Sequence, residues 1–459
     1  MRLRTLTLCA VQFVDVMGVT VVVAALPRML ASVHGSATDA GLLVPAYAVG
    51  FGGLLLLAAR LGDRLGPRRI VLAGLALYAI GSVLCASAQA PAALLVGRFL
   101  QGVGAAASVP NALVLLIASA PRRERALSAW NATGGLAGAA GLLVGGLVTS
   151  SLGWRVIFWA GLAAVVVLAL AIIRVTPADG EPTTERDHLN LPSVGLQTVT
   201  VAALVAAANA TTHSWRITAA LLAVVAILVP PLLIRERRTT SQLVPTRTRR
   251  RPGVLAGVAG SFGVTATTSP LVILTTLYFQ DSEGFSPAGA GLMILPFSFA
   301  VVVGAAVATR LLRVATPLTI LLSGLGMIGL AGLLAARQPS LVVVSLVMAG
   351  AGNGVGAVAA YALGTAVPPE EQGTVTGLLN TAAQLGTAIM VATAIGVATA
   401  TGNPLNHRAG WLTVAATAAL TCIACLWLHR RTLEGRRGRQ VSGSTRTAAV
   451  MRAQEGGTP

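Results

Sequence analysis

The stretch 58–74, AARLGDRLGPRRIVLAG, concentrates charge in a chain in which charged residues make up only 10% of the sequence. On either side of it, residues 40–59 and 70–88 carry no charged side chain. Apolar runs of about twenty residues are long enough to cross a lipid bilayer as helices. The stretch therefore predicts a tight polar turn between two transmembrane helices.

The whole chain repeats this pattern of long apolar runs and short polar turns. Its 459 residues are 55% hydrophobic and have a mean hydropathy of +0.78, well above that of a soluble domain. Because a backbone in lipid must satisfy its own hydrogen bonds, and the runs are too long for barrel strands, we expect helices. All the basic residues are arginine. Without lysine the chain cannot form the phosphate-binding loop of an ATPase motor, so transport would need another energy source.

Fourteen apolar runs can be separated by their glycine, proline and charge punctuation. They lie near 5–30, 40–60, 70–88, 92–119, 127–149, 154–173, 191–210, 216–234, 254–279, 287–309, 314–335, 340–367, 374–401 and 409–428. The sequence thus predicts an all-α membrane protein with fourteen transmembrane helices.

The two ends of the chain resemble each other. Segment 60–75 matches segment 310–325 at arginine, proline, isoleucine, leucine and glycine positions, and GVGAAA (102–107) matches GVGAVA (354–359). The predicted domains are a six-helix bundle over 1–173, a linker with two additional helices over 174–252, a second six-helix bundle over 253–429 and a basic, disordered cytoplasmic tail over 430–459. Parallel repeats around a site at the membrane midplane are a transporter architecture.

The arginines are distributed unequally between the two sides of the predicted membrane helices. Most fall on the side that holds both termini and the loop 60–69. The other side holds Arg28, Arg155, Arg216, Arg337 and Arg408. The positive-inside rule then predicts a multi-pass protein of the cytoplasmic membrane with both termini in the cytoplasm.

Several motifs, in this order, resemble the major facilitator superfamily and, within it, the fourteen-span drug:proton antiporter family. ARLGDRLGPRR (59–69) is similar to the signature loop between the second and third spans, RFLQGVGAAASVPNAL (98–113) to the fourth-span motif, and FVDVMGVTVVVAALP (13–27) to the first-span motif. Further matches are GWRVIF (153–158), YFQDSEGFSPAGAGLMILP (278–296) and PPEEQGTVTGLLNTAAQLGTA (368–388). The resemblance implies two six-helix bundles with two extra helices inserted between them.

The fifth-span motif departs from the family pattern. The family has Gly-Pro-x-x-Gly-Gly, whereas here Leu142 follows Gly141 where the proline is expected. Losing that proline removes a kink and leaves the direction of transport open. Glycines expected to allow close helix packing are Gly102, Gly104, Gly141, Gly145 and Gly146.

Asp15 is the only carboxylate that we find well inside a predicted span, near the membrane midplane. An ionised carboxylate there is costly, so it must pair with a cation or hold a proton. Arg98, inside the fourth predicted span, also needs a partner because arginine cannot lose its charge. We predict that Asp15 and Arg98 carry proton coupling. The alternative is a permanent ion pair that locks two helices together.

The resemblance also implies that the loop 59–69 is a conformational latch that holds the two halves together in the outward-open state. We expect Asp63 to face the arginines of the next cytoplasmic loop. The latch residues are Asp63, Arg64, Gly66, Arg68, Arg69, Arg122, Arg123 and Arg125. In the repeat, Arg313 stands where Asp63 stands, which predicts one working latch. The alternative is a solvated loop that only obeys the positive-inside rule.

A sparse set of polar side chains is predicted to line a central substrate cavity, although each can instead bond a neighbouring helix. These are Gln12, Asp15, Asn111, Asn131, Asn353, Tyr361, Asn380 and Gln384. Few polar groups in an apolar cavity favour proton-coupled efflux of amphipathic, antibiotic-like small molecules. The expected partners are this substrate, protons and membrane lipids. We expect a monomer without enzymatic activity, cofactor, metal or nucleic acid. The alternatives are a facilitator or exporter of a specific metabolite and, more remotely, a non-transporting sensor or scaffold.

Overall fold

Long helices joined by short turns make up the computed structural model of this chain. It describes residues 2–34, 37–120, 122–180, 191–210, 215–238, 248, 251–285, 287–400 and 406–428. Within these residues, 12 helical segments are long and apolar enough to cross a membrane. The chain is therefore a multi-pass, all-α membrane protein.

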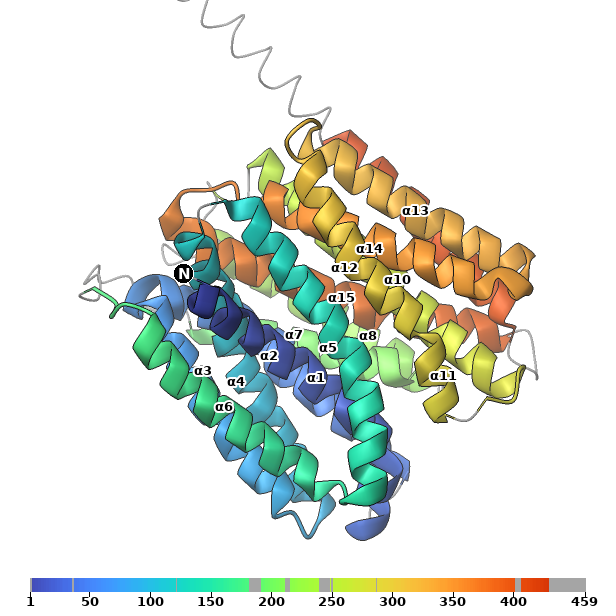
Figure 1. Cartoon of the computed structure of the whole chain (residues 1–459), viewed down its shortest axis with the longest axis horizontal. Helices are drawn as coiled ribbons and strands as arrows, with labels where there is room; N and C mark the ends of the chain where they lie inside the picture. The colour runs from blue at the N-terminus through green and yellow to red at the C-terminus, as the bar shows by residue number, and fades with distance from the viewer. Residues whose placement is uncertain are drawn as a thin grey trace, which may run out of the picture.

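The helices fall into two groups along the chain. The first comprises α1 (Arg2–Ser32), α2 (Ala37–Leu65), α3 (Pro67–Ala86), α4 (Pro91–Ser119), α5 (Arg123–Ser151) and α6 (Arg155–Val175), followed by α7 (Leu191–Ala210) and α8 (Trp215–Arg238). The second comprises α10 (Pro252–Asp281), α11 (Pro287–Met293), α12 (Leu295–Leu311), α13 (Pro317–Arg337), the 3-10 turn η1 (Pro339–Leu341), α14 (Val342–Gly364), α15 (Pro369–Ala400) and a last helix, His407–Leu428. Figure 1 shows α1–α6 on one side of the molecule and α10–α15 on the other.

Two of the fourteen predicted spans, α5 and α7, are not among the 12 candidate spans found in the described residues. Within α7 the apolar segment found is Pro192–Leu204. Helix α5 is rich in glycine, which lets helices approach closely. It packs along α1 and against α12 of the other half. Length and composition thus support 12 of the fourteen predicted spans.

The repeat seen in the sequence is also a repeat of helix packing. A Cβ atom on Gly74 of α3 would lie 2.5 Å from the carbonyl oxygen of Gly104 on α4. A Cβ atom on Gly324 of α13 would lie 2.6 Å from the backbone nitrogen of Gly356 on α14. Only glycine permits such close approach. Both halves therefore join these two helices through matching glycine contacts.

The apolar core is continuous between the halves at only one end of the described helices. The largest buried cluster joins both halves at the end that carries the arginine-rich loops, and its members include Leu113, Leu127, Val254, Val358 and Val375. Towards the opposite end the cores are separate. One cluster lies within the first half around Met29 and Trp154, and another lies within the second half around Leu274 and Trp411.

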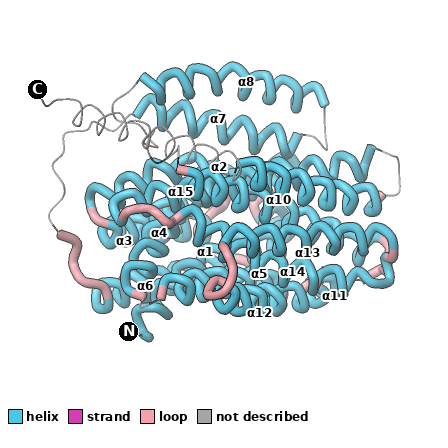
Figure 2. The backbone as a smooth tube through the Cα atoms, turned by 90° about the horizontal axis from the view of Figure 1, so that it is seen from above, coloured by secondary structure: helices cyan, strands magenta, loops and turns pink. Residues whose placement is uncertain are grey.

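Helices α7 and α8 form an addition on the outside of these halves. Helix α7 packs against α2 and α15, one helix from each half, and α8 packs against α7 on its outer side (Figure 2). Thr198 of α7 donates a hydrogen bond to the carbonyl oxygen of Gly53 on α2 at 3.1 Å. The inserted pair is therefore docked beside the boundary between the halves.

Candidate functional site

Asp15 lies in the middle of α1 and is 9% exposed. Its carboxylate accepts a hydrogen bond from the hydroxyl group of Tyr47 on α2. A buried tyrosine usually places its hydroxyl on a polar partner in this way. The acid is thus held by a neutral donor.

Arg98 is fully buried on α4. Its Nη1 atom donates to Oε1 of Gln101 at 2.9 Å and to the carbonyl oxygen of Gly18 at 3.3 Å. The guanidinium carbon also lies 4.6 Å from the centroid of the Tyr47 ring, a cation–π contact. Within the described structure Arg98 makes no direct ion pair with Asp15. Tyr47 instead stands between them, with its hydroxyl on the acid and its ring on the base.

Two nitrogens of this guanidinium group, Nε and Nη2 of Arg98, are buried without a hydrogen-bond partner. Gln101 is already engaged, because it donates to Ser82 on α3 at 2.9 Å. A buried donor that lacks its acceptor is costly, and more so when it is charged. An acceptor brought within reach of Nε or Nη2 would therefore be bound strongly.

A cavity of about 380 Å³ lies between the two halves. Gln12 of α1, Asn131 of α5 and Asn353 of α14 line it, as their sequence positions predict. Thr265 of α10 and Ser298 of α12 add hydroxyl groups, and much of the remaining lining is valine, isoleucine, phenylalanine and glycine. The cavity is thus mainly apolar with a few separated polar groups.

Several residues expected in this cavity do not line it, namely Asp15, Asn111, Tyr361, Asn380 and Gln384. Asp15 differs from the lining residues Gln12 and Val16 because each helical residue turns by about 100°, which directs it towards α2 and α4. Asn111 donates to the carbonyl oxygen of Ala58 on α2 at 3.2 Å. Tyr361 donates to Asn380 at 2.9 Å and so joins α14 to α15. Polar groups on these helices bond a neighbouring helix instead of a solute.

Asp63, at the end of α2, contacts the second half of the chain. Its Oδ2 atom accepts hydrogen bonds from the backbone nitrogen of Thr374 at 3.1 Å and from its hydroxyl group at 2.7 Å. Thr374 lies in the first turns of α15, where the positive end of the helix dipole favours an anion. The sequence predicts that Asp63 faces arginines, and its described hydrogen bonds are to a helix start.

The expected latch arginines are divided among different contacts. Arg123 donates to the hydroxyl group of Thr365 at the end of α14, which is a second polar contact between the halves. Arg122 and Arg125 are exposed. Arg64 is partly buried beside Asp63. Only Arg123 of the loop 122–125 thus has a described bond across the boundary.

Arg68 and Arg69 begin α3 and bind an acid that follows α6. Their backbone nitrogens donate to the two carboxylate oxygens of Asp179 at 3.2 and 2.8 Å. The preceding Gly66 has a φ of 99°, a conformation that glycine adopts without strain. Asp179 therefore caps α3 from outside the helix and anchors the signature loop within the first half.

Comparison with known proteins fits this geometry. The model of the Major Facilitator Superfamily matches residues 8–391 and again residues 318–452. The chain belongs to the major facilitator superfamily. The cephamycin export protein CmcT of Amycolatopsis lactamdurans is 31% identical over 397 residues, covering 82% of this chain and 81% of CmcT. The puromycin resistance protein pur8 of Streptomyces alboniger is 33% identical over 398 residues, covering 82% of this chain and 78% of pur8.

Two solved transporter structures share the fold at low sequence identity. The human organic anion transporter MFSD10 superposes with a TM-score of 0.67 at 18% identity, covering 92% of this chain and 99% of that one. The E. coli fucose:proton symporter superposes with a TM-score of 0.62 at 16% identity, covering 92% of this chain and 98% of the symporter. The resemblance inferred from the motifs is thus confirmed, and the chain is a secondary transporter of this superfamily.

The glycines singled out in this superfamily member lie at close helix contacts. A Cβ atom on Gly102 would lie 2.2 Å from the carbonyl oxygen of Tyr47, and one on Gly145 would lie 2.8 Å from that of Val21. Gly104 and Gly141 are similarly close to α3 and α1. The surroundings of Gly146 and Leu142 lie outside the described part of the structure.

Three residues that make polar contacts in this transporter are not predicted from the sequence: Tyr47, Asp179 and Thr374, the last of which lies within the motif 368–388. Tyr47 is one of 4 tyrosines and lies in an otherwise apolar run. Its hydroxyl needs a partner when buried, a signal that points to a nearby polar site. Thr374 and Asp179 give no comparable signal, because their roles depend on which helix ends meet in the fold.

Proposed function

We propose that this chain exports amphipathic, drug-like or antibiotic-like small molecules across the cytoplasmic membrane in exchange for protons, by alternating access. The observation that carries the proposal is Asp15, a buried acid that is bonded by Tyr47 and, in the described structure, makes no direct ion pair with Arg98. In a membrane interior such an acid is stable when it holds a proton or gains a cation. Asp15 can therefore alternate between the two.

The Nε and Nη2 atoms of Arg98, which lack hydrogen-bond partners, can bind the deprotonated carboxylate of Asp15. When Asp15 holds a proton, its hydrogen bond with Tyr47 is sufficient. When the proton leaves, the carboxylate is drawn towards Arg98. Because Asp15 does not line the cavity, the proton and Arg98 compete for the carboxylate, and protonation from outside shifts the equilibrium between conformations so that substrate is released outward.

The nature of the substrate is supported by the cavity and by the relatives. The cavity between the halves is mainly apolar with separated polar groups such as Gln12 and Asn353, which suits broad hydrophobic recognition. The relatives' names include cephamycin export, puromycin resistance and multidrug resistance. Together these favour drug-like solutes.

The proposed topology has fourteen spans, with α5 and α7 crossing along with the 12 apolar segments. The domains remain as expected from the sequence: bundles over 1–173 and 253–429, a linker over 174–252 and a tail from 430. Both termini lie in the cytoplasm because the arginine-rich loops do. The Asp63–Thr374 contact then closes the cytoplasmic side.

Transport into proteoliposomes tests this proposal. Vesicles with an acidic interior are offered a panel of lipophilic cations, neutral compounds and anions, with and without an uncoupler. We expect the acidic interior to drive accumulation of lipophilic solutes and the uncoupler to abolish it. Equilibration of a single hydrophilic metabolite, independent of the pH gradient, would instead establish the facilitator alternative.

A further inference from the structure

Helix α8 meets the rest of the protein through α7 (Figure 2). In its apolar window, Arg216–Arg235, none of the residues is buried. The mean hydropathy of this window is 2.7. Such a helix is stable in a bilayer only if lipid covers the faces that protein leaves open.

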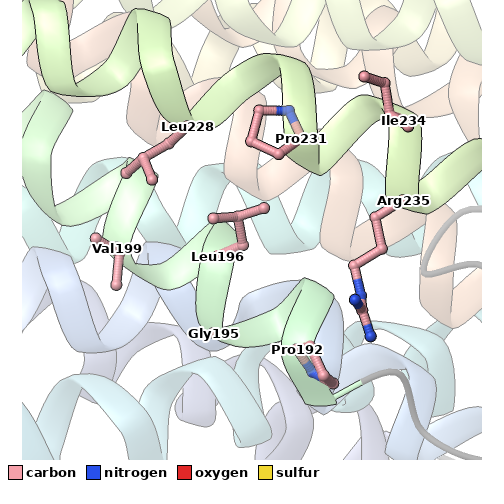
Figure 3. A pocket seen from close by; sticks show the side chains of 8 residues that line it. All are labelled: Pro192, Gly195, Leu196, Val199, Leu228, Pro231, Ile234 and Arg235. Carbon is pink, nitrogen blue, oxygen red and sulfur yellow. The ribbon is translucent and has the colours of Figure 1, made fainter.

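A groove of about 750 Å³ runs between α7 and α8 (Figure 3). Its walls include Gly195, Leu196 and Val199 of α7 and Leu228 and Pro231 of α8. A Cβ atom on Gly195 would meet no atom within 4 Å, so the groove is open beside this glycine. The volume falls within the range of roughly 300–1,000 Å³ typical of ligand pockets. An apolar groove inside a membrane suits a hydrocarbon chain.

One end of the groove is cationic. Arg235, on the last turns of α8, lines it and is exposed, and Figure 3 shows its side chain extending beside Pro192. The sequence 235–251 holds seven arginines and one glutamate. Guanidinium groups bind phosphate through paired hydrogen bonds, and arginine clusters next to a membrane helix attract acidic lipid headgroups.

We propose that this groove binds an acidic phospholipid, with an acyl chain along Leu196 and Leu228 and the phosphate on Arg235. The site is separate from the central cavity and does not depend on the proposed transport. Because α7 packs on both α2 and α15, the lipid is held beside the two helices that form the Asp63–Thr374 contact.

Native mass spectrometry of the full chain in mild detergent tests the proposal. Phosphatidylglycerol and phosphatidylcholine with identical acyl chains are titrated in parallel. We expect about tenfold tighter binding of phosphatidylglycerol, the gain from one charge-assisted contact. Gly195→Leu fills the groove and is expected to reduce that binding about tenfold. Arg235→Gln is expected to remove the preference between the two lipids.

Matched controls come from other helices. Gly326→Leu makes the same change at an exposed glycine of α13 whose added Cβ atom also meets no atom within 4 Å. Arg174→Gln removes an exposed arginine in the last turn of α6. Both are expected to bind phosphatidylglycerol like the parent chain. If Gly195→Leu does not fold, the comparison of lipid binding by Arg235→Gln and by Arg174→Gln still tests the proposal.

Three results would overturn the proposal. The first is equal binding of both lipids by the parent chain, or equal retention by Gly195→Leu and Gly326→Leu. The second is displacement of phosphatidylglycerol by glycerol phosphate alone, which would indicate a phosphate site. The third is a dimer that Gly195→Leu converts to monomer, which would place a second copy of the chain in the groove.

Discussion

The two ends of the helical bundle are built differently. At the arginine-rich end the halves share one apolar core, and Asp63 and Arg123 of the first half bond Thr374 and Thr365 of the second. At the opposite end each half has a core of its own. Polar contacts described there join helices of the same half, such as Arg28 to the carbonyl oxygen of Thr149 at 2.5 Å. The described contacts therefore join the halves at the arginine-rich end, which we propose is the closed gate of this conformation.

The gate is also unequal between the repeats. In the two polar contacts described above, the first half supplies the charge and the second half supplies hydroxyl or backbone groups. The repeat of Asp63 is Arg313, which is exposed. Helix α13 caps itself through Thr316, which accepts from Thr319 at 3.3 Å, whereas α3 relies on the distant Asp179. Duplication thus preserved the helix packing, whereas the acid of the first-half loop is replaced by an arginine in the second half.

The largest effect is expected from Asp63→Asn, which removes the charge from the α15 contact. A hydrogen bond to a charged group contributes about 1.5–3 kcal/mol, so the closed gate should lose at least about tenfold in population. Spin labels on Arg174→Cys and Val314→Cys, in a background without the native cysteines, report the distance between the halves. Glu283→Gln, which removes an acid near the opposite end, should leave that distance unchanged. An unaltered distance in Asp63→Asn would mean that this contact does not hold the gate.

A steric change at the same contact should have a somewhat smaller effect. In Gly373→Ala the new Cβ atom would lie 2.2 Å from Oδ1 of Asp63 and 3.2 Å from the carbonyl oxygen of Ala59. Overpacking of this kind costs about 1–3 kcal/mol and should force α15 away from α2. Gly396→Ala, towards the other end of the same helix, meets no atom within 4 Å. Thermal unfolding in detergent should separate the two variants, and equal melting temperatures would contradict the close contact.

The smallest effect concerns the two helix starts. Asp179→Ala removes the acceptor of both Arg68 and Arg69, which should cost about 1 kcal/mol and speed amide exchange there roughly fivefold. Thr316→Ala removes one longer bond from α13 and should change exchange less. Hydrogen exchange with mass spectrometry on peptides covering 66–70 and 316–320 makes the comparison. A larger increase of amide exchange at the start of α13 in Thr316→Ala than at the start of α3 in Asp179→Ala would contradict the proposed difference between the two helix starts.

The sequence predicts the fold well because the repeat and the apolar runs are local patterns. It also predicts Gln12, Asn131 and Asn353 as cavity residues, since isolated polar groups in apolar helices must find a polar surface. It does not predict that Tyr47 separates Asp15 from Arg98, because an aromatic residue in an apolar run is typical of a packed core position. The partner of Asp63 lies 311 residues away, and no local pattern encodes such a pairing.

For Asn111 the sequence leaves two roles open, and in the structure its amide donates to the carbonyl oxygen of Ala58 on the adjacent helix. Composition cannot distinguish an amide that lines a cavity from one that joins two helices.

The central claim is that Asp15 carries the proton. It is tested most directly by proton-driven transport of a lipophilic cation into proteoliposomes containing Asp15→Asn, with Glu283→Gln as the matched loss of an acid. We predict that Asp15→Asn loses accumulation driven by the pH gradient but still exchanges substrate down its own gradient, while Glu283→Gln behaves like the parent chain. Full proton-driven accumulation by Asp15→Asn would contradict the account.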